Sequence, residues 1–260
     1  SEKFYHPNTN FTYAYKKPID TLITETTYGR DEESESITKE STLNELEFYI
    51  NTVFNGGGNV VIPAFAIGRI QEVTLALLIL RKQGRIPFST KILYPFGNLS
   101  LAHAYSKVYF EKYKYIIAES LDENMDFSYD RFVEKYLMRI NYRNKSFFNF
   151  PNQILIGTPG MLGMHVEKAQ DDSEIFGLTE IVLSALQSKI HSIIFVGYQA
   201  DGTLGGKVQN TKLGETIRHL DRTFVRNTPH IYKCSFPGHV SASGIIDLVT
   251  LVKPKNVILT

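Results

Sequence analysis

Three short segments of the sequence end in side chains that could act on a phosphodiester bond. Glu25 and His239 each follow an apolar run, and Gly68-Arg69 stands between a predicted strand and a predicted helix. A carboxylate and a histidine can move protons in a reaction. A helix N-terminus with an arginine attracts phosphate, because its free N–H groups and the guanidinium both favour anions.

Each of these residues also has a simpler structural interpretation. From spacing alone, Glu25 is a solvated loop carboxylate, and a single histidine such as His239 is most often structural. Arg69 is equally consistent with a phosphate contact and with a salt bridge that holds a loop. Gly56–Gly58 is most simply a helix stop. Cys234, inside a predicted strand, is expected to be buried and inert.

The elements that position these residues alternate between strands and helices. Apolar runs and helical spacings alternate along most of the chain, and Gly56–Gly58 separates the first predicted helix from the strand that follows it. This order predicts an α/β fold with a mainly parallel, Rossmann-like sheet that has helices on both faces. The predicted strands are 21–24, 60–65, 91–94, 154–157, 193–197, 230–236 and 256–260, and the predicted helices are 43–54, 70–80, 101–115, 130–141, 178–189 and 243–252.

Two glycine-rich loops follow predicted strands of this sheet. Thr158-Pro159-Gly160 follows the strand at 154–157, and Asp201–Gly205 follows the strand at 193–197. Loops after the carboxyl ends of parallel strands are where such sheets bind ligands. Glycine-rich loops are also ordinary turns, so this signal is weak by itself.

Composition restricts the class of protein. The 260 residues carry a net charge of +1, so no basic field covers the whole surface and any nucleic-acid path must be local. The single cysteine excludes an internal disulfide and fits a reducing compartment. No apolar run reaches the roughly 18 residues that a membrane helix requires. We therefore expect a soluble, intracellular, cytoplasmic protein that does not bind membranes.

The ordered motifs resemble those of the metallo-β-lactamase/β-CASP nucleases. They are most similar to the branch that contains the endonuclease subunit of the cleavage and polyadenylation specificity factor and its archaeal relatives. The resemblance covers nearly the whole chain. It rests on I-D-T-L-I-T-E-T-T-Y-G-R (19–30), N-G-G-G-N-V-V-I-P-A-F-A-I-G-R-I-Q-E (55–72), T-P-G-M-L (158–162), G-Y-Q-A-D-G-T-L-G (197–205) and I-Y-K-C-S-F-P-G-H (231–239).

The resemblance implies a domain organisation, because the family inserts the β-CASP domain into the metallo-β-lactamase domain. Residues 1–30 would be an edge segment of the metallo-β-lactamase domain, 31–230 the β-CASP domain, and 231–260 the segment that returns to the metallo-β-lactamase domain. The full-length enzyme would bind two zinc ions. No two of the seven histidines of this chain are closer than nine residues in the sequence. A dinuclear zinc site requires ligands at shorter spacing, so this pattern does not suit one. The resemblance implies that the chain begins after one zinc ligand and ends before another. We therefore assign no metal ligand to this chain and expect no zinc bound to it. We also expect the chain to be inactive alone.

The activity implied by the resemblance is zinc-dependent hydrolysis of single-stranded RNA, in mRNA 3′-end processing or RNA decay. Cleavage would be endonucleolytic, and 5′-to-3′ exonuclease activity is left open. Glu25 would fix the imidazole tautomer of His239, which would protonate the leaving 3′-oxygen after a zinc-bound hydroxide attacks phosphorus. The sequence departs from the family at Pro237-Gly238, where Ser-Ala is usual, and at Ser241, where an acidic residue is usual. Ser241 or Ser243 is therefore expected to cap the following helix.

The RNA contacts implied by the resemblance lie in the loops described above and in the turn after Glu25. The partners would be single-stranded RNA and, for the full-length protein, either a second copy of itself or a processing complex. A rival interpretation is a catalytically inactive paralogue that serves as a scaffold or RNA-binding subunit, and the presence of both Glu25 and His239 argues against it. The predicted RNA- or phosphate-binding residues are Tyr28, Arg30, Gly68, Arg69, Thr158, Gly160, Tyr198, Thr203 and Lys207.

Overall fold

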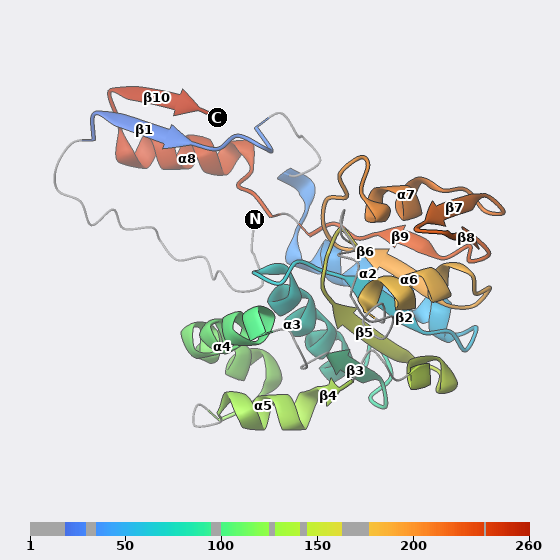
Figure 1. Cartoon of the computed structure of the whole chain (residues 1–260). Helices are drawn as coiled ribbons and strands as arrows, with labels where there is room; N and C mark the ends of the chain where they lie inside the picture. Colours follow the sequence, from blue (N-terminus) through green and yellow to red (C-terminus); the bar gives the residue numbers. More distant parts are fainter. Residues whose placement is uncertain are drawn as a thin grey trace. The chain divides into compact units, whose positions relative to one another are not determined.

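The chain separates into two compact units in a computed structural model (Figure 1). The central unit is Leu43–Cys234, and the terminal unit combines Ser1–Thr42 with Ser235–Thr260. The structure describes residues 19–29, 35–94, 100–124, 128–140, 145–162, 177–236 and 238–260.

A six-stranded sheet forms the middle of the central unit, and all of its strand pairs are parallel. The three innermost strands are buried at every position, as expected when layers cover both faces of a parallel sheet. In spatial order the strands are β4 (Met138–Arg139), β3 (Lys91–Tyr94), β5 (Gln153–Gly157), β2 (Val60–Pro63), β6 (Ser192–Phe195) and β9 (Ile231–Lys233).

Helices cover both faces of this sheet. The connection from β2 to β3 moves toward the β4 edge, and the connection from β5 to β6 moves toward the β9 edge. Because parallel crossovers are right-handed, connections in opposite directions place α3 and α6 on opposite faces. The α/β fold with a mainly parallel sheet is therefore confirmed. The helical elements of the unit are α2 (Lys39–Phe54, which starts just before it), α3 (Arg69–Lys82), α4 (Ser100–Leu121), α5 (Tyr129–Tyr136), the 3-10 helix η1 (Lys145–Asn149), α6 (Leu178–Leu186) and α7 (Leu204–Asn210).

One local prediction is wrong in the central unit, and one pair of strands was missed. The helix predicted for 130–141 ends at Tyr136, because Leu137 is extended and Met138 pairs with Leu93 of β3. The antiparallel hairpin of β7 (Thr216–His219) and β8 (Arg222–Val225) was not predicted. Its turn contains Leu220 at a φ of 54°, and this residue type gives no turn signal in the sequence.

The terminal unit has a much smaller core. Strand β1 (Thr21–Thr24) pairs in parallel with β10 (Asn256–Leu259), and helix α8 (Ala242–Val252) lies next to this pair in Figure 1. Every residue of β10 is exposed, and Ile245 is the buried residue of α8. None of the described helices is both long and apolar enough to cross a membrane. The cytoplasmic location stays a prediction.

Candidate active site and RNA-binding residues

Glu25 and His239 lie within hydrogen-bonding distance of each other in the terminal unit. Glu25 follows β1, and His239 lies two residues before Ser241, the N-cap of α8. A parallel bridge between Tyr28 and Ser241 holds these two segments together. As a result, Oε2 of Glu25 lies 3.2 Å from Nδ1 of His239. The structure thus brings together the two residues that the sequence singles out for proton transfer.

Backbone N–H groups fix the carboxylate of Glu25. Thr27 N–H donates to Oε2 at 2.9 Å, and Val240 N–H donates to Oε1 at 3.4 Å. The hydrogen bonds from Thr27 are the main cause of a lowered pKa at Glu25, and Val240 and the neighbouring His239 lower it further. Glu25 is therefore a carboxylate at neutral pH, and it presents a negative charge to the imidazole.

The geometry distinguishes the two nitrogens of His239. Because Nδ1 faces the Glu25 carboxylate, Nδ1 carries the hydrogen, and Nε2 is the nitrogen available for proton exchange with a substrate. The Tyr28 ring meets the imidazole edge-on, with centroids 5.3 Å apart and an interplanar angle of 78°. The side chain of His239 is 48% exposed, so a ligand can reach it.

The turn after His239 is held by a carboxylate that the sequence analysis missed. Ser241 caps α8 by accepting a hydrogen bond from Gly244 N–H, so of the two predicted candidates Ser241 is the N-cap. Glu35 accepts hydrogen bonds from the backbone N–H and the hydroxyl of Ser243, at 2.8 and 2.7 Å. These bonds from Ser243 lower the pKa of Glu35. Glu35 therefore brings a carboxylate to a turn where Ser241 replaces the acidic residue usual in the family.

Gly68 and Arg69 lie at the start of α3 in the central unit. Gly68 is the N-cap residue with a φ of 80°, a conformation that side chains rarely adopt. Nη1 of Arg69 lies 2.8 Å from Oε2 of Glu72, and the arginine side chain is only 11% exposed. Arg69 does form a salt bridge, but its partner lies in the same turn of α3, so this pair does not hold a loop as the simpler interpretation expected. A phosphate contact, which would have to share the guanidinium with Glu72, stays a prediction.

The two glycine-rich loops meet at the carboxyl end of the sheet. Nε2 of Gln199 donates to the carbonyl oxygen of Gly160 at 3.1 Å, and Gly205 N–H donates to the carbonyl oxygen of Met161 at 3.0 Å. Gly160 is buried, and Thr158 is partly buried. Thr203 is 3% exposed and caps α7 by accepting from Gly206 N–H. Its hydroxyl thus has a structural role, and an RNA contact by Thr203 stays a prediction.

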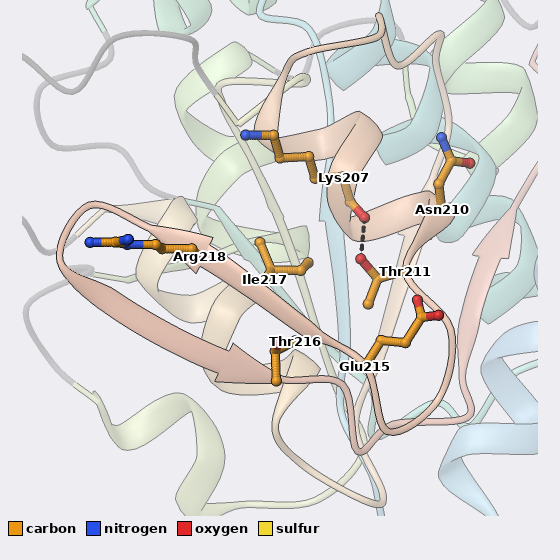
Figure 2. A pocket seen from close by; sticks show the side chains of 7 residues that line it. All are labelled: Lys207, Asn210, Thr211, Glu215, Thr216, Ile217 and Arg218. Carbon is orange, nitrogen blue, oxygen red and sulfur yellow. Dashed lines mark hydrogen bonds between the residues drawn. The ribbon is translucent and has the colours of Figure 1, made fainter.

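Lys207 lies on α7 at the edge of a pocket of about 380 Å³. The carbonyl oxygen of Lys207 accepts a hydrogen bond from the Thr211 hydroxyl at 2.6 Å. The side chain of Lys207 is exposed. Figure 2 shows the amino group of Lys207 and the guanidinium of Arg218 pointing away from Glu215. Of the other predicted contacts, Tyr198 is 71% exposed, and Arg30 lies outside the described residues.

The described part of the chain does not suit a dinuclear zinc site. Within it, no group of three or more histidine, cysteine, aspartate or glutamate side chains is placed to hold a metal ion.

Comparison with known proteins finds relatives that match over most of the chain. No family model matches it. It is 28% identical to the Integrator complex subunit 11 homolog of Dictyostelium discoideum, over 92% of the chain and 30% of that protein. It is 27% identical to cleavage and polyadenylation specificity factor subunit 3-II of Arabidopsis thaliana, over 93% of the chain and 35% of that protein. It is also 27% identical to the transcription termination factor FttA of Pyrococcus horikoshii, over 91% of the chain and 35% of that protein.

These relatives confirm the resemblance that the motifs indicate. The chain is related, over more than nine-tenths of its length, to metallo-β-lactamase/β-CASP RNA nucleases. Within that class it is similar to subunits of the Integrator and of the cleavage and polyadenylation specificity factor, and to the archaeal termination factor. The chain spans about a third of the length of these relatives.

Proposed function

We propose that this chain is the β-CASP part of a zinc-dependent ribonuclease that cleaves phosphodiester bonds of single-stranded RNA. Residues 31–230 would form the β-CASP domain, and 1–30 and 231–260 would belong to a metallo-β-lactamase domain. The separation of the chain into a central and a terminal unit supports this division. The relatives named after RNA cleavage and transcription termination support the activity.

The observation that carries this proposal is the Glu25–His239 pair. Two residues from opposite ends of the sequence meet at 3.2 Å, and both side chains stay more than two-fifths exposed. A structural ion pair gains little at such an exposed position. A proton donor that must reach a substrate, in contrast, has to be exposed.

In the proposed reaction, Nε2 of protonated His239 gives its proton to the leaving 3′-oxygen as the P–O bond breaks. Glu25 keeps the imidazole oriented through Nδ1 and stabilises its positive charge before the transfer. When bound in the full-length protein, zinc would supply a nucleophilic hydroxide at neutral pH. Because the described residues offer no ligand cluster, we propose that this chain is inactive alone.

The RNA path we propose runs along local features of each unit. Tyr28 would contact RNA near His239, and Arg30, which lies outside the described residues, is proposed as a further contact. In the central unit, Gly68-Arg69 and the loops with Thr158, Gly160, Tyr198, Thr203 and Lys207 would contact backbone and bases. The net charge of +1 favours such a local path over a field that covers the surface. The cleavage would be endonucleolytic, with 5′-to-3′ exonuclease activity as a second mode, and the full-length protein would act in a processing complex or as a homodimer.

The test is cleavage of a labelled single-stranded RNA by the full-length enzyme that the resemblance implies. We expect His239→Ala to lower the rate by roughly 10²–10⁴-fold, the usual contribution of a general acid, with the zinc content unchanged. His230→Ala is the matched control. His230 lies just before β9, at the amino end of the strands, whereas the two glycine-rich loops lie at the carboxyl end. Equal rates for wild type and His239→Ala would remove His239 from the mechanism. A wild-type protein with bound zinc that binds RNA without cleaving it would instead support an inactive paralogue.

A further inference from the structure

An aromatic ring is exposed at the carboxyl end of β2, between the two glycine-rich loops. A Cβ atom added to Gly197 would lie 3.0 Å from Cε2 of Phe65, and one added to Gly160 would lie 3.3 Å from Cδ1 of the same ring. The ring therefore lies between two glycine backbones, and the absence of side chains at both positions makes room for it. Despite these contacts, Phe65 is 36% exposed.

The backbone holds Phe65 firmly in this position. Ala64 N–H donates to the carbonyl oxygen of Gly157 at 2.8 Å, which continues the β2–β5 pairing past the end of the strand. Ile70 N–H donates to the carbonyl oxygen of Phe65 at 3.1 Å, which connects the residue to the first turn of α3. A ring fixed in this way loses little conformational entropy when a ligand stacks on it.

A second aromatic side chain follows one of the two glycines. Tyr198 comes directly after Gly197 and is 71% exposed. Single exposed apolar side chains are normal on protein surfaces. Here, however, two aromatic residues lie on neighbouring segments at the end of a parallel sheet where such folds bind ligands.

We propose that Phe65 and Tyr198 stack on unpaired nucleobases of the RNA substrate, an inference that rests on the proposed function. Both rings offer π faces, and base–aromatic stacking tolerates any base sequence. Stacking on these rings also requires bases that are free of a duplex, which would favour single-stranded RNA.

The test measures the affinity of the 260-residue chain for two end-labelled 12-nucleotide RNAs by fluorescence anisotropy. One is oligouridine, and the other carries abasic ribose units at its four central positions. Since stacking contributes about 1–3 kcal/mol per base, we expect Tyr198→Ala and Phe65→Leu each to weaken oligouridine binding by about 5- to 150-fold. Tyr198→Phe keeps the ring and should stay within about twofold of the wild type.

Three controls separate stacking from a loss of structure. Phe88→Ala removes a ring that is 74% exposed before β3, at the other end of the strands, and should not change the affinity. The abasic RNA should bind wild type and Tyr198→Ala with similar affinity, because it has no central bases to stack. Thermal unfolding of each variant shows whether the fold is intact, and Tyr198→Ala is the safer variant because its side chain is exposed.

The outcomes distinguish this inference from the proposed function. If the chain binds oligouridine and neither Tyr198→Ala nor Phe65→Leu weakens binding, stacking is wrong and RNA binding stands. The exposed rings would then be assigned to a contact with another protein. If the wild-type chain binds neither RNA, both the stacking and the proposed RNA path are overturned.

Discussion

Strands β5 and β10 have similar apolar sequences, Q-I-L-I-G and N-V-I-L, but opposite environments. Every residue of β5 is buried between layers of the central unit, and every residue of β10 is exposed. An apolar run therefore predicts that a strand forms, but it does not predict what covers that strand. Burial depends on the neighbouring layers, which a short sequence window does not contain.

The polar side chains of the two units also differ in how far they are buried. In the central unit, Asn59 is fully buried and its amide bonds three backbone groups, the carbonyl oxygens of Phe147 and Phe150 and the N–H of Gln153. In the terminal unit, Glu25 and His239 are partly exposed and bond mainly to each other and to a nearby turn. The buried amide of Asn59 thus has a structural role in the central unit, and the Glu25–His239 pair of the terminal unit remains accessible from solvent.

The sharpest test of this comparison replaces one isoleucine in each strand. Ile154 of β5 is 0% exposed and Ile258 of β10 is 49% exposed. We expect Ile154→Ala to destabilise the central unit by about 2–5 kcal/mol, because it removes buried methylene groups and leaves a cavity. Ile258→Ala should change the local stability by no more than about 0.5 kcal/mol. Hydrogen exchange of the β5 and β10 amides measures both, and equal effects would contradict the difference between the units.

A smaller effect is expected at the N-terminus of α8. Ser241→Ala removes the N-cap side chain and should destabilise the helix by about 1 kcal/mol. Ser241→Asn, which keeps a capping side chain, is the matched control. Faster amide exchange throughout α8 in the alanine variant alone would show that the cap holds the turn that carries His239. No difference between the two variants would mean that Glu35 suffices to hold this turn.

Part of the fold and of the site could be predicted from the sequence. Buried strands such as β2 and β6, and the helix that Gly68 begins, are encoded by local apolar runs and glycines. The meeting of Glu25 and His239 followed from the resemblance, because no local pattern relates residues so far apart. Glu35 was missed because its role depends on a contact across the sequence with Ser243. The hairpin around Leu220 was missed because tertiary packing overrides its weak turn propensity.

The role of Arg69 can be decided by the salt dependence of RNA binding. If its guanidinium contacts a phosphate, Arg69→Ala should weaken binding to all single-stranded RNAs by a similar factor. The slope of log affinity against log salt should then fall by about 0.7, the value for one phosphate of a single strand. Affinities at several salt concentrations, for two unrelated RNAs, give these slopes. Unchanged slopes would exclude a phosphate contact by Arg69 and keep its structural pairing with Glu72.

The smallest effect we predict is a loss of stability in mild acid. Burial lowers the pKa of His191 below its ordinary value of 6.5, and Nδ1 of its neutral ring accepts a hydrogen bond from Asn59 N–H at 3.0 Å. The unfolded chain therefore binds more protons than the folded chain between the lowered pKa and about 6.5, so stability falls as pH decreases through that window. Burial shifts His219 and His230 in the same direction. The measurement is denaturant unfolding of the wild type and of His191→Gln between pH 7.5 and roughly 5. The free energy of unfolding should depend less on pH in the variant. Identical pH profiles would exclude His191 as a contributor.

The central claim, that His239 protonates the leaving oxygen, is tested most directly with an RNA whose 3′-bridging oxygen is replaced by sulfur at one position. A thiol has a pKa of about 8.5, so a thiolate can leave without a proton donor. In the full-length enzyme, His239→Ala should cleave the oxygen-linked RNA roughly 10²–10⁴-fold more slowly than the wild type. On the sulfur-linked RNA, the account predicts that the same variant approaches the wild-type rate. An equal loss on both substrates would contradict the assignment of His239 as the general acid.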